Sequence, residues 1–374
     1  MAGVYIVSDN ITSPLGTTTA DNFAQLKNGI SGVRLHNNSM SDTSFYASLF
    51  GDDTFADNVQ HTKFEQLLIA SITNALEGTG LEPAGSKTAL IISSTKGNIS
   101  LLETEVHTPE LNKRIALHNS AKLVANHFGF ITQPIVVSNA CISGILGTVT
   151  GMRLIESGQY ETVIVSGADV ISKFILSGFQ SFNAISSQPC KPFDADRDGI
   201  TLGEGAATII LSSNPKYNRG IRVMGGASSN DANHISAPSR TGEELAQAIN
   251  ASLKQAGLSS SDIDLISAHG TATIYNDEME AKAITLAGLQ TTPLNSLKGF
   301  YGHTLGAAGL IESIISLQSL KQNIIIPTAG FNQIGVPTPV NVCTELTSQP
   351  LKNILKTASG FGGCNGAVIF SKAD

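Results

Sequence analysis

Two sets of five short apolar runs constrain the fold of this chain more than any other feature. The runs are rich in β-branched residues, and longer stretches with helical spacing separate them. Such continuous apolar runs are typical of buried strands in α/β proteins. We predict strands at residues 4–8, 89–93, 135–138, 162–168 and 206–212, and again at 221–225, 263–268, 293–297, 354–358 and 367–371. The order of these elements predicts an α/β fold.

The two sets of strands divide the chain into corresponding halves. The turn-rich residues 212–220 lie between them, so we expect one half over residues 1–212 and the other over residues 213–374. Cys141 and His303 hold matching places, because each follows the third strand of its half and precedes a helical stretch. This match favours a structural duplication. The halves share no evident residue-level identity, so two unrelated α/β domains remain the alternative.

Charge and composition exclude several classes of protein. The formal net charge is -7 and no run of Lys or Arg occurs, so we expect no nucleic-acid binding. No segment reaches the roughly twenty apolar residues that span a bilayer, and the N-terminus does not read as a signal peptide. We therefore expect a cytoplasmic protein. The cysteines form no Cys-x-x-Cys pair, which argues against a disulfide framework or a structural metal site; they are Cys141, Cys190, Cys343 and Cys364.

Cys141 has the setting of a nucleophile. It follows a predicted strand and precedes a stretch with helical spacing, so we expect it at a helix N-terminus. There the unpaired amides and the helix dipole favour the thiolate. Small residues such as Ser143 and Gly144 would let a substrate come close. A buried structural cysteine is the alternative for any isolated cysteine, but this context favours the nucleophile.

Two histidines also lie at predicted strand ends. His269 and His303 are each next to glycine, and together they can point into one crevice beyond the edge of a sheet. Taken singly, each could be an ordinary loop histidine. After His269 we predict a helix whose start Asp277 and Glu280 would form as a variant of the capping box.

Two loops resemble cofactor motifs without matching them. Residues 302–309, GHTLGAAG, lack the glycine spacing of a dinucleotide-binding loop and its acidic residue, so no nicotinamide cofactor is expected. Residues 194–199, DADRDG, begin like a calcium loop, but Gly205 stands where the bidentate Glu is needed and Glu204 lies one residue early. We expect no bound metal.

Taken together, the motifs resemble those of the β-ketoacyl synthases that elongate chains on acyl carrier protein. The similar segments are VSNACISG at the cysteine, PCKPFDADRDGITLGEGAA at 189–207, AHGTATIYNDEMEA at 268–281, LKGFYGHTLGAAGLIES at 297–313 and SGFGGCNGAVIF at 359–370. Their order and spacing extend over nearly the whole chain. The resemblance implies the thiolase-like fold, with two duplicated halves in α-β-α-β-α layers.

The resemblance also implies the chemistry. Cys141 corresponds to the acylated nucleophile and His269 with His303 to the paired histidines that bind malonyl-carrier during decarboxylation. Lys298 and Glu312 correspond to a supporting lysine and its ion-pair partner. The expected reaction is a decarboxylative Claisen condensation of malonyl-carrier with an acyl group on Cys141.

Further positions follow from the same resemblance. The backbone amides of Cys141 and Phe361 would form the oxyanion hole, and Phe361 would gate the acyl pocket. Thr271 and Thr273 would contact the phosphopantetheine arm of acyl carrier protein, the expected partner. No cofactor of the enzyme itself is implied, and the protein is expected to form a homodimer, or a heterodimer with a related subunit.

Departures from the family pattern concern the pocket. The chain is short between the second strand and Cys141. Ser359 replaces a bulky Phe, Tyr301 replaces a common Thr, and Cys364 replaces a usual Thr. An aryl, polyene or other polyketide-like substrate therefore stays open as an alternative to a saturated fatty acyl chain.

Two rival readings stay open at this point. A thiolase acting on coenzyme A thioesters needs a second cysteine, which Cys364 could supply. A catalytically silent chain-length subunit typically lacks the nucleophile, whereas Cys141, His269 and His303 are all present.

Overall fold

The computed structural model describes residues 3–51, 54–55, 60–233 and 235–373. Every predicted strand lies in one hydrogen-bonded sheet. The first half contributes β1 (Val4–Thr12), β4 (Thr88–Ser93), β5 (Ile135–Val137), β6 (Thr162–Asp169) and β8 (Gly205–Ser212). The second half contributes β9 (Ile221–Asn230), β10 (Leu265–Ser267), β11 (Pro293–Asn295), β15 (Asn353–Gly360) and β16 (Cys364–Lys372). A short strand that we did not predict, β13 (Asn341–Val342), extends the sheet beyond β11.

The two halves repeat the same strand order. The first half runs β5-β4-β6-β8-β1 and the second runs β11-β10-β15-β16-β9, so each strand has its counterpart at the same place. The two half-sheets join where β1 pairs antiparallel with β9, at Val4 with Val223 and at Tyr5 with Arg222. The predicted duplication is therefore visible in the topology. The exact boundary between residues 212 and 213 stays a prediction.

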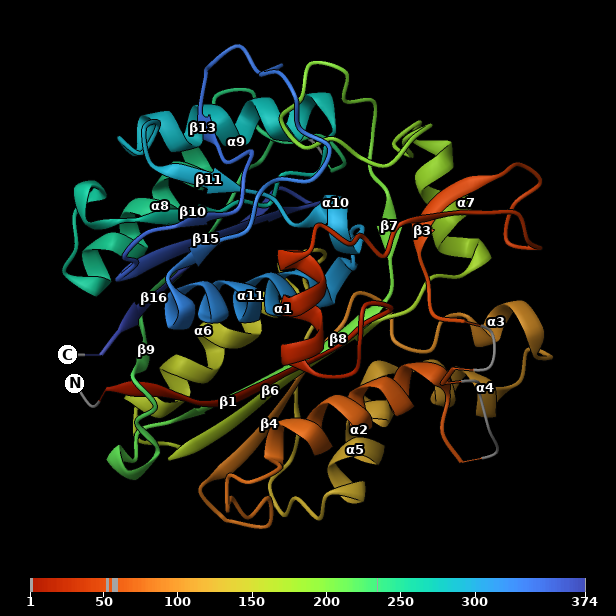
Figure 1. Ribbon diagram of the computed structural model, residues 1–374. Helices are drawn as coiled ribbons and strands as arrows, with labels where there is room; N and C mark the ends of the chain where they lie inside the picture. Colours follow the sequence, from red (N-terminus) through yellow and green to blue (C-terminus); the bar gives the residue numbers. More distant parts are fainter. Residues whose placement is uncertain (1–2, 52–53, 56–59, 234, 374) are drawn as a thin grey trace.

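Helices complete five layers (Figure 1). Helices α6 (Ser143–Glu156) and α11 (Ala308–Gln322) lie between the two half-sheets. The outer layers include α2 (Lys63–Leu76) with α5 (Leu117–His127) on one side, and α8 (Glu243–Ala256) with α9 (Ile274–Leu286) on the other. The α-β-α-β-α arrangement expected from the sequence is confirmed.

The central helices are buried around most of their circumference, as their position requires. In α11 every residue except those near its C-terminal end and Gln318 is buried. Gly144 lets α6 approach α11 closely, because a Cβ there would lie 2.8 Å from Leu310 N. Since α6 follows the predicted nucleophile and α11 follows one predicted histidine, this close packing brings the two halves of the site together.

Smaller elements surround this framework. A three-stranded sheet consists of β2 (Arg34–His36), β3 (Phe45–Ser48) and β7 (Leu202–Gly203), and a two-stranded one of β12 (Ile324–Ile325) and β14 (Thr347–Ser348). The remaining helices are α1 (Thr19–Lys27), α3 (Leu101–Thr104), α4 (Pro109–Ile115), α7 (Lys173–Ser181) and α10 (Lys298–Tyr301). Within the described ranges, no helix has the length and apolar character needed to cross a membrane.

Candidate active site

Cys141 lies in a sharp turn between β5 and α6. Ala140 adopts a positive φ of 43°, which residues with a side chain rarely do. Ser143 stabilises the turn, because its Oγ accepts a hydrogen bond from Asn139 N at 2.8 Å and donates one to Ala140 O at 2.6 Å. Backbone strain of this kind persists where the surrounding structure holds it, often at functional sites. The turn presents the sulfur to a pocket.

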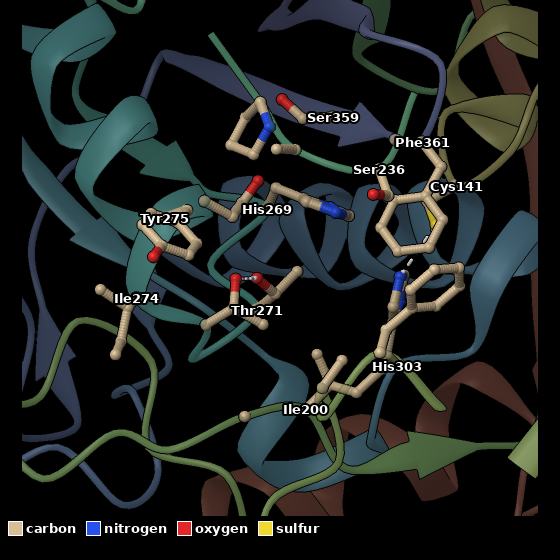
Figure 2. A pocket seen from close by; sticks show the side chains of 18 of the residues that line it. Cys141, Ile200, Ser236, His269, Thr271, Ile274, Tyr275, His303, Ser359 and Phe361 are labelled. Carbon is tan, nitrogen blue, oxygen red and sulfur yellow. Dashed lines mark hydrogen bonds between the residues drawn. The ribbon is translucent and has the colours of Figure 1, made fainter. Parts of the chain in front are cut away.

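This pocket has a volume of about 350 Å³ and is shown in Figure 2. Six of the predicted site residues line it: Cys141, His269, Thr271, Thr273, His303 and Phe361. The two threonine hydroxyls lie 3.0 Å apart. Lys298 and Glu312 do not line the pocket but lie buried behind it. The structure therefore brings together residues from both halves of the chain.

His303 is the histidine nearest to the sulfur. Its Nε2 lies 3.0 Å from Cys141 Sγ. The loop that carries it is held by the segment before β8: His303 N donates to Thr201 O at 2.6 Å, and Gly203 N donates to His303 O at 3.1 Å. Gly302 permits this approach, since it has a φ of +66° and a Cβ there would lie 2.3 Å from Leu202 O. The motif at 189–207, to which the sequence assigned no role, thus positions His303.

His269 faces His303 from the loop after β10. The two rings are nearly perpendicular, with centroids 5.2 Å apart. Glu280 in α9 holds the loop, because its carboxylate accepts hydrogen bonds from His269 N at 2.8 Å and Gly270 N at 2.7 Å. Its Oε1 also accepts the Thr357 hydroxyl at 2.7 Å.

The predicted capping role of Asp277 and Glu280 is wrong. Helix α9 begins at Ile274, and its N-cap, Thr273, makes no side-chain capping bond. Asp277 instead accepts hydrogen bonds from the backbone of Thr271 and Ala272, at 2.9 and 3.1 Å. The two acids therefore stabilise the histidine loop rather than the helix start.

Behind the histidines lies a buried group of charges. Lys298 Nζ donates to His269 O at 2.8 Å and to Glu312 Oε1 at 2.6 Å, and lies 3.5 Å from His269 Nδ1. Sequence reasoning missed a second lysine here. Lys356 Nζ lies 2.6 Å from Glu312 Oε2, so one carboxylate is shared by two ammonium groups. Its place in an otherwise apolar strand, ILKTA, was the available signal.

The protonation states differ from those predicted for a cysteine at a helix start. Burial raises the pKa of the Cys141 thiol to about 12, with a smaller contribution from Cys364. Burial lowers the pKa of His269 and of His303 well below the usual value, and the Lys298 ammonium lowers both further. The resting site therefore pairs a thiol with two neutral imidazoles, and the sulfur needs a base to become nucleophilic.

Phe361 stands at the entrance with other aromatic side chains. It is 42% exposed, and its ring lies 5.8 Å from that of Phe179 and 5.7 Å from that of Phe182. The preceding Gly360 packs against the nucleophile, since a Cβ there would lie 3.0 Å from Cys141 N. Ser359 also lines the pocket and donates a hydrogen bond to Asn365 at 2.7 Å. A small side chain at position 359 leaves this part of the pocket open.

Two of the three carboxylates of the DADRDG loop, those of Asp194 and Asp198, are engaged with the chain itself. Asp194 accepts hydrogen bonds from the backbone of Asp196, Asn332 and Gln333. Asp198 accepts hydrogen bonds from the backbone and hydroxyl of Ser187. These contacts give the loop a structural role next to the segment that holds His303.

The five-layered fold, with a cysteine and two histidines in one pocket, is that of a thiolase-like acyltransferase. Family models are more specific. The model described as beta-ketoacyl synthase, N-terminal domain, matches residues 1–216, and the model of the C-terminal domain matches residues 221–332. The chain belongs to the β-ketoacyl synthase family.

Individual relatives resemble the chain over its whole length. The 3-oxoacyl-[acyl-carrier-protein] synthase 2 of Vibrio cholerae is 28% identical over 99% of each chain. Among solved structures, the ketosynthase ApeO in complex with its chain length factor ApeC from Xenorhabdus doucetiae is 27% identical, with a TM-score of 0.88 over 100% of this chain and 98% of that chain. The ishigamide ketosynthase/chain length factor is 25% identical, with a TM-score of 0.89 over 100% of both chains.

Proposed function

We propose that this chain is a β-ketoacyl-[acyl-carrier-protein] synthase that condenses malonyl-carrier with an acyl group held on Cys141, in fatty acid, polyketide or polyene biosynthesis. The observation that carries the proposal is the contact of 3.0 Å between Cys141 Sγ and His303 Nε2, with His269 opening onto the same pocket. A thiol, a neutral base and a second imidazole are the groups that this reaction needs.

In the first half-reaction, Cys141 Sγ attacks the carbonyl carbon of the acyl thioester and the carrier sulfur leaves. The thiol proton passes to His303 Nε2 and then to the departing sulfur, so His303 returns to its neutral form. Because the pKa of His303 is lowered by burial, the imidazole is free to accept this proton. The backbone amides of Cys141 and Phe361 stabilise the oxyanion of the tetrahedral intermediate.

In the second half-reaction, malonyl-carrier enters the pocket. The bond between its methylene carbon and its carboxylate breaks, carbon dioxide leaves, and the electron pair moves into the thioester carbonyl. His269 and His303 donate hydrogen bonds to this enolate oxygen. For His303 this requires the neutral tautomer that carries its proton on Nε2, whereas acceptance of the thiol proton requires the tautomer that carries it on Nδ1. The enolate carbon attacks the acyl group, the Cys141 sulfur leaves, and a solvent proton restores the thiol.

Other residues assist from the edges of the pocket. Thr271 and Thr273, whose hydroxyls are 3.0 Å apart, bind the phosphopantetheine arm of the carrier. Phe361 gates the entrance, and the pair of Lys298 and Glu312 supports His269 from behind. The structural relatives that are ketosynthases with chain length factors support a heterodimer as the alternative to a homodimer.

The geometry disfavours the two rival readings. A thiolase-type enzyme would need a second cysteine facing the substrate, but Cys364 does not line the pocket, and its thiol contacts Asn139 O at 3.7 Å and Phe361 O at 3.5 Å. A silent chain-length subunit would not be expected to retain both the cysteine and the two histidines in one pocket.

The test offers purified protein a series of acyl-carriers, then malonyl-carrier, and follows both the mass of Cys141 and the β-ketoacyl products. We expect an acyl adduct that is absent in Cys141→Ala, and longer products with release of carbon dioxide. Ser359→Phe should narrow the range of accepted acyl groups. Transfer from coenzyme A thioesters without decarboxylation would instead support the thiolase reading, and the absence of any adduct would support the silent subunit.

A further inference from the structure

A second buried lysine lies where the condensation mechanism assigns no role. Lys356 is in β15, and its side chain is fully buried. Its Nζ donates to Ser267 O at 3.1 Å and Ala268 O at 3.0 Å, the two carbonyls that precede His269. It also lies 2.6 Å from Glu312 Oε2. Lys356 thus connects the end of β10, from which the His269 loop departs, to the central helix α11.

The surroundings do not require a charged side chain for packing. On the same face of β15, Ile354 and Ala358 belong to the apolar cluster that includes residues of α11. An apolar side chain of similar length would fill the space of Lys356 without the loss of hydration that a buried ammonium suffers. The charge therefore calls for an explanation besides stability.

The way in which Lys298 and Lys356 share Glu312 explains why a charged side chain is buried here. Glu312 Oε1 accepts from Lys298 and Oε2 is paired with Lys356, each at 2.6 Å. One carboxylate cannot neutralise both ammonium groups, so Lys298 keeps part of its charge directed at His269, whose Nδ1 lies 3.5 Å away. On the opposite face of β15, Glu280 is hydrogen-bonded to the amides of His269 and Gly270 and to the Thr357 hydroxyl.

We propose that Lys356 is a positioning residue for the condensation: it shares Glu312 with Lys298 and fixes the end of β10, so that His269 is held toward the thioester with a cation behind it. This inference rests on the proposed function of His269. It concerns only the way in which the chain orients that imidazole and sets its charge, because Lys356 does not line the pocket.

Charge effects support the same assignment. Burial, Lys298 and Lys356 all lower the pKa of both His269 and His303. Removing the ammonium at position 356 therefore raises the pKa of both imidazoles, so that they become protonated at a higher pH. Other charged or titratable groups near them include Lys298 in α10, Glu312 in α11, Glu280 in α9, the pair of Lys96, which follows β4, and Asp169 at the end of β6, and Cys141 before α6. Asp198, Asp231 and Tyr275 line the same pocket.

The experiment compares Lys356→Met and Lys356→Arg with the unmodified chain. Two rates are measured against pH: acyl transfer from acyl-carrier to Cys141, and release of carbon dioxide from malonyl-carrier. We expect Lys356→Met to lower kcat for decarboxylation by on the order of ten- to a hundredfold, because misplacement of a catalytic group has effects of this size. In Lys356→Met the acid limb of the pH–rate profile for acyl transfer should move to higher pH. Lys356→Arg, which keeps a positive charge, should recover part of both changes.

A matched control separates an effect on the positioning of His269 from an effect on the stability of the fold. Leu355→Ala removes a fully buried side chain from the opposite face of the same strand. It should lower Tm while leaving the acid limb where it is. An unchanged kcat and acid limb in Lys356→Met would overturn the proposal, as would an equal shift in Leu355→Ala. If Lys356→Met does not fold, Lys356→Gln takes its place, because it removes the charge but keeps a polar end near Ser267 O and Ala268 O. An unshifted profile together with undiminished decarboxylation in folded Lys356→Gln also overturns the proposal. Failure of the unmodified chain to acylate Cys141 would contradict the proposed function itself.

Discussion

At the scale of single residues, the reactive sulfur and its neighbours are uncharged before substrate binds. The Cys141 thiol has a pKa of about 12 because protein surrounds it, and the same burial keeps His269 and His303 neutral. The contact of 3.0 Å between Cys141 Sγ and His303 Nε2 then provides the route for the proton.

The pH dependence of alkylation tests this state of the thiol. Since the thiolate is the reactive form, the rate of Cys141 alkylation by iodoacetamide should keep rising with pH beyond 9 instead of levelling off near the ordinary cysteine pKa. The measurement is peptide mass spectrometry after short exposures, with Cys141→Ser as control for the other cysteines. A plateau below pH 8 would contradict the raised pKa.

The two histidines should differ in their contribution to the half-reactions. His269→Ala removes one donor to the enolate, so decarboxylation should fall about a hundredfold or more while acylation of Cys141 is largely retained. His303→Ala also removes the group in contact with the sulfur, so both half-reactions should slow. Separate assays with acyl-carrier and malonyl-carrier measure the two effects. Equal losses in His269→Ala would show that this histidine also serves acylation.

At the scale of elements, two acidic side chains of helix α9 hold the loop that carries His269. Glu280 and Asp277 are fully buried and accept amide hydrogen bonds from the segment between β10 and α9. Four consecutive backbone donors, from His269 to Ala272, are satisfied in this way. The loop can therefore adopt an irregular path inside the protein without leaving its donors unpaired.

Replacement of Glu280 by Gln tests this role. The amide would present a donor where Gly270 N or His269 N also donates, so we expect a loss of about 1–3 kcal/mol in the free energy of unfolding and slower decarboxylation. Glu278→Gln is the control, because that side chain is partly exposed and is 3.5 Å from Arg197. Urea unfolding and carbon dioxide release measure both effects. Equal effects of the two substitutions would contradict the specific role of Glu280.

The elements most accessible to prediction were those with a strong local pattern. All ten apolar runs form strands of the main sheet, and the stretch after Cys141 forms α6. The short strands β2, β3, β7, β12, β13 and β14 were not predicted, because each has only two to four residues and depends on tertiary pairing. The spacing of Asp277 and Glu280 suggested a cap, but it could not reveal that their carboxylates accept hydrogen bonds from the loop amides of residues 269–272. Lys356 was missed for a related reason: its partners come from β10 and α11.

At the scale of the whole molecule, the site exists only where the two halves meet. The first half supplies Cys141 and the segment that holds the His303 loop, and the second supplies both histidines and the charged group behind them. The half-sheets join at β1 and β9, and the central helices α6 and α11 are in close contact. The nucleophile and the histidines therefore come together only when both halves of the duplicated fold have formed.

This arrangement predicts that the halves do not fold independently. Residues 1–212 alone would expose the face of α6 that packs on α11, and residues 213–374 alone would expose α11, which is buried nearly all round in the whole chain. We expect neither fragment to show cooperative unfolding, and co-expression of the two to restore Cys141 acylation. As control, a protease site placed at the exposed residues Asn218 and Arg219 should allow the folded chain to be cut without loss of activity. A fragment that unfolds cooperatively by itself would show that the half is an autonomous domain and that the interface only assembles the site.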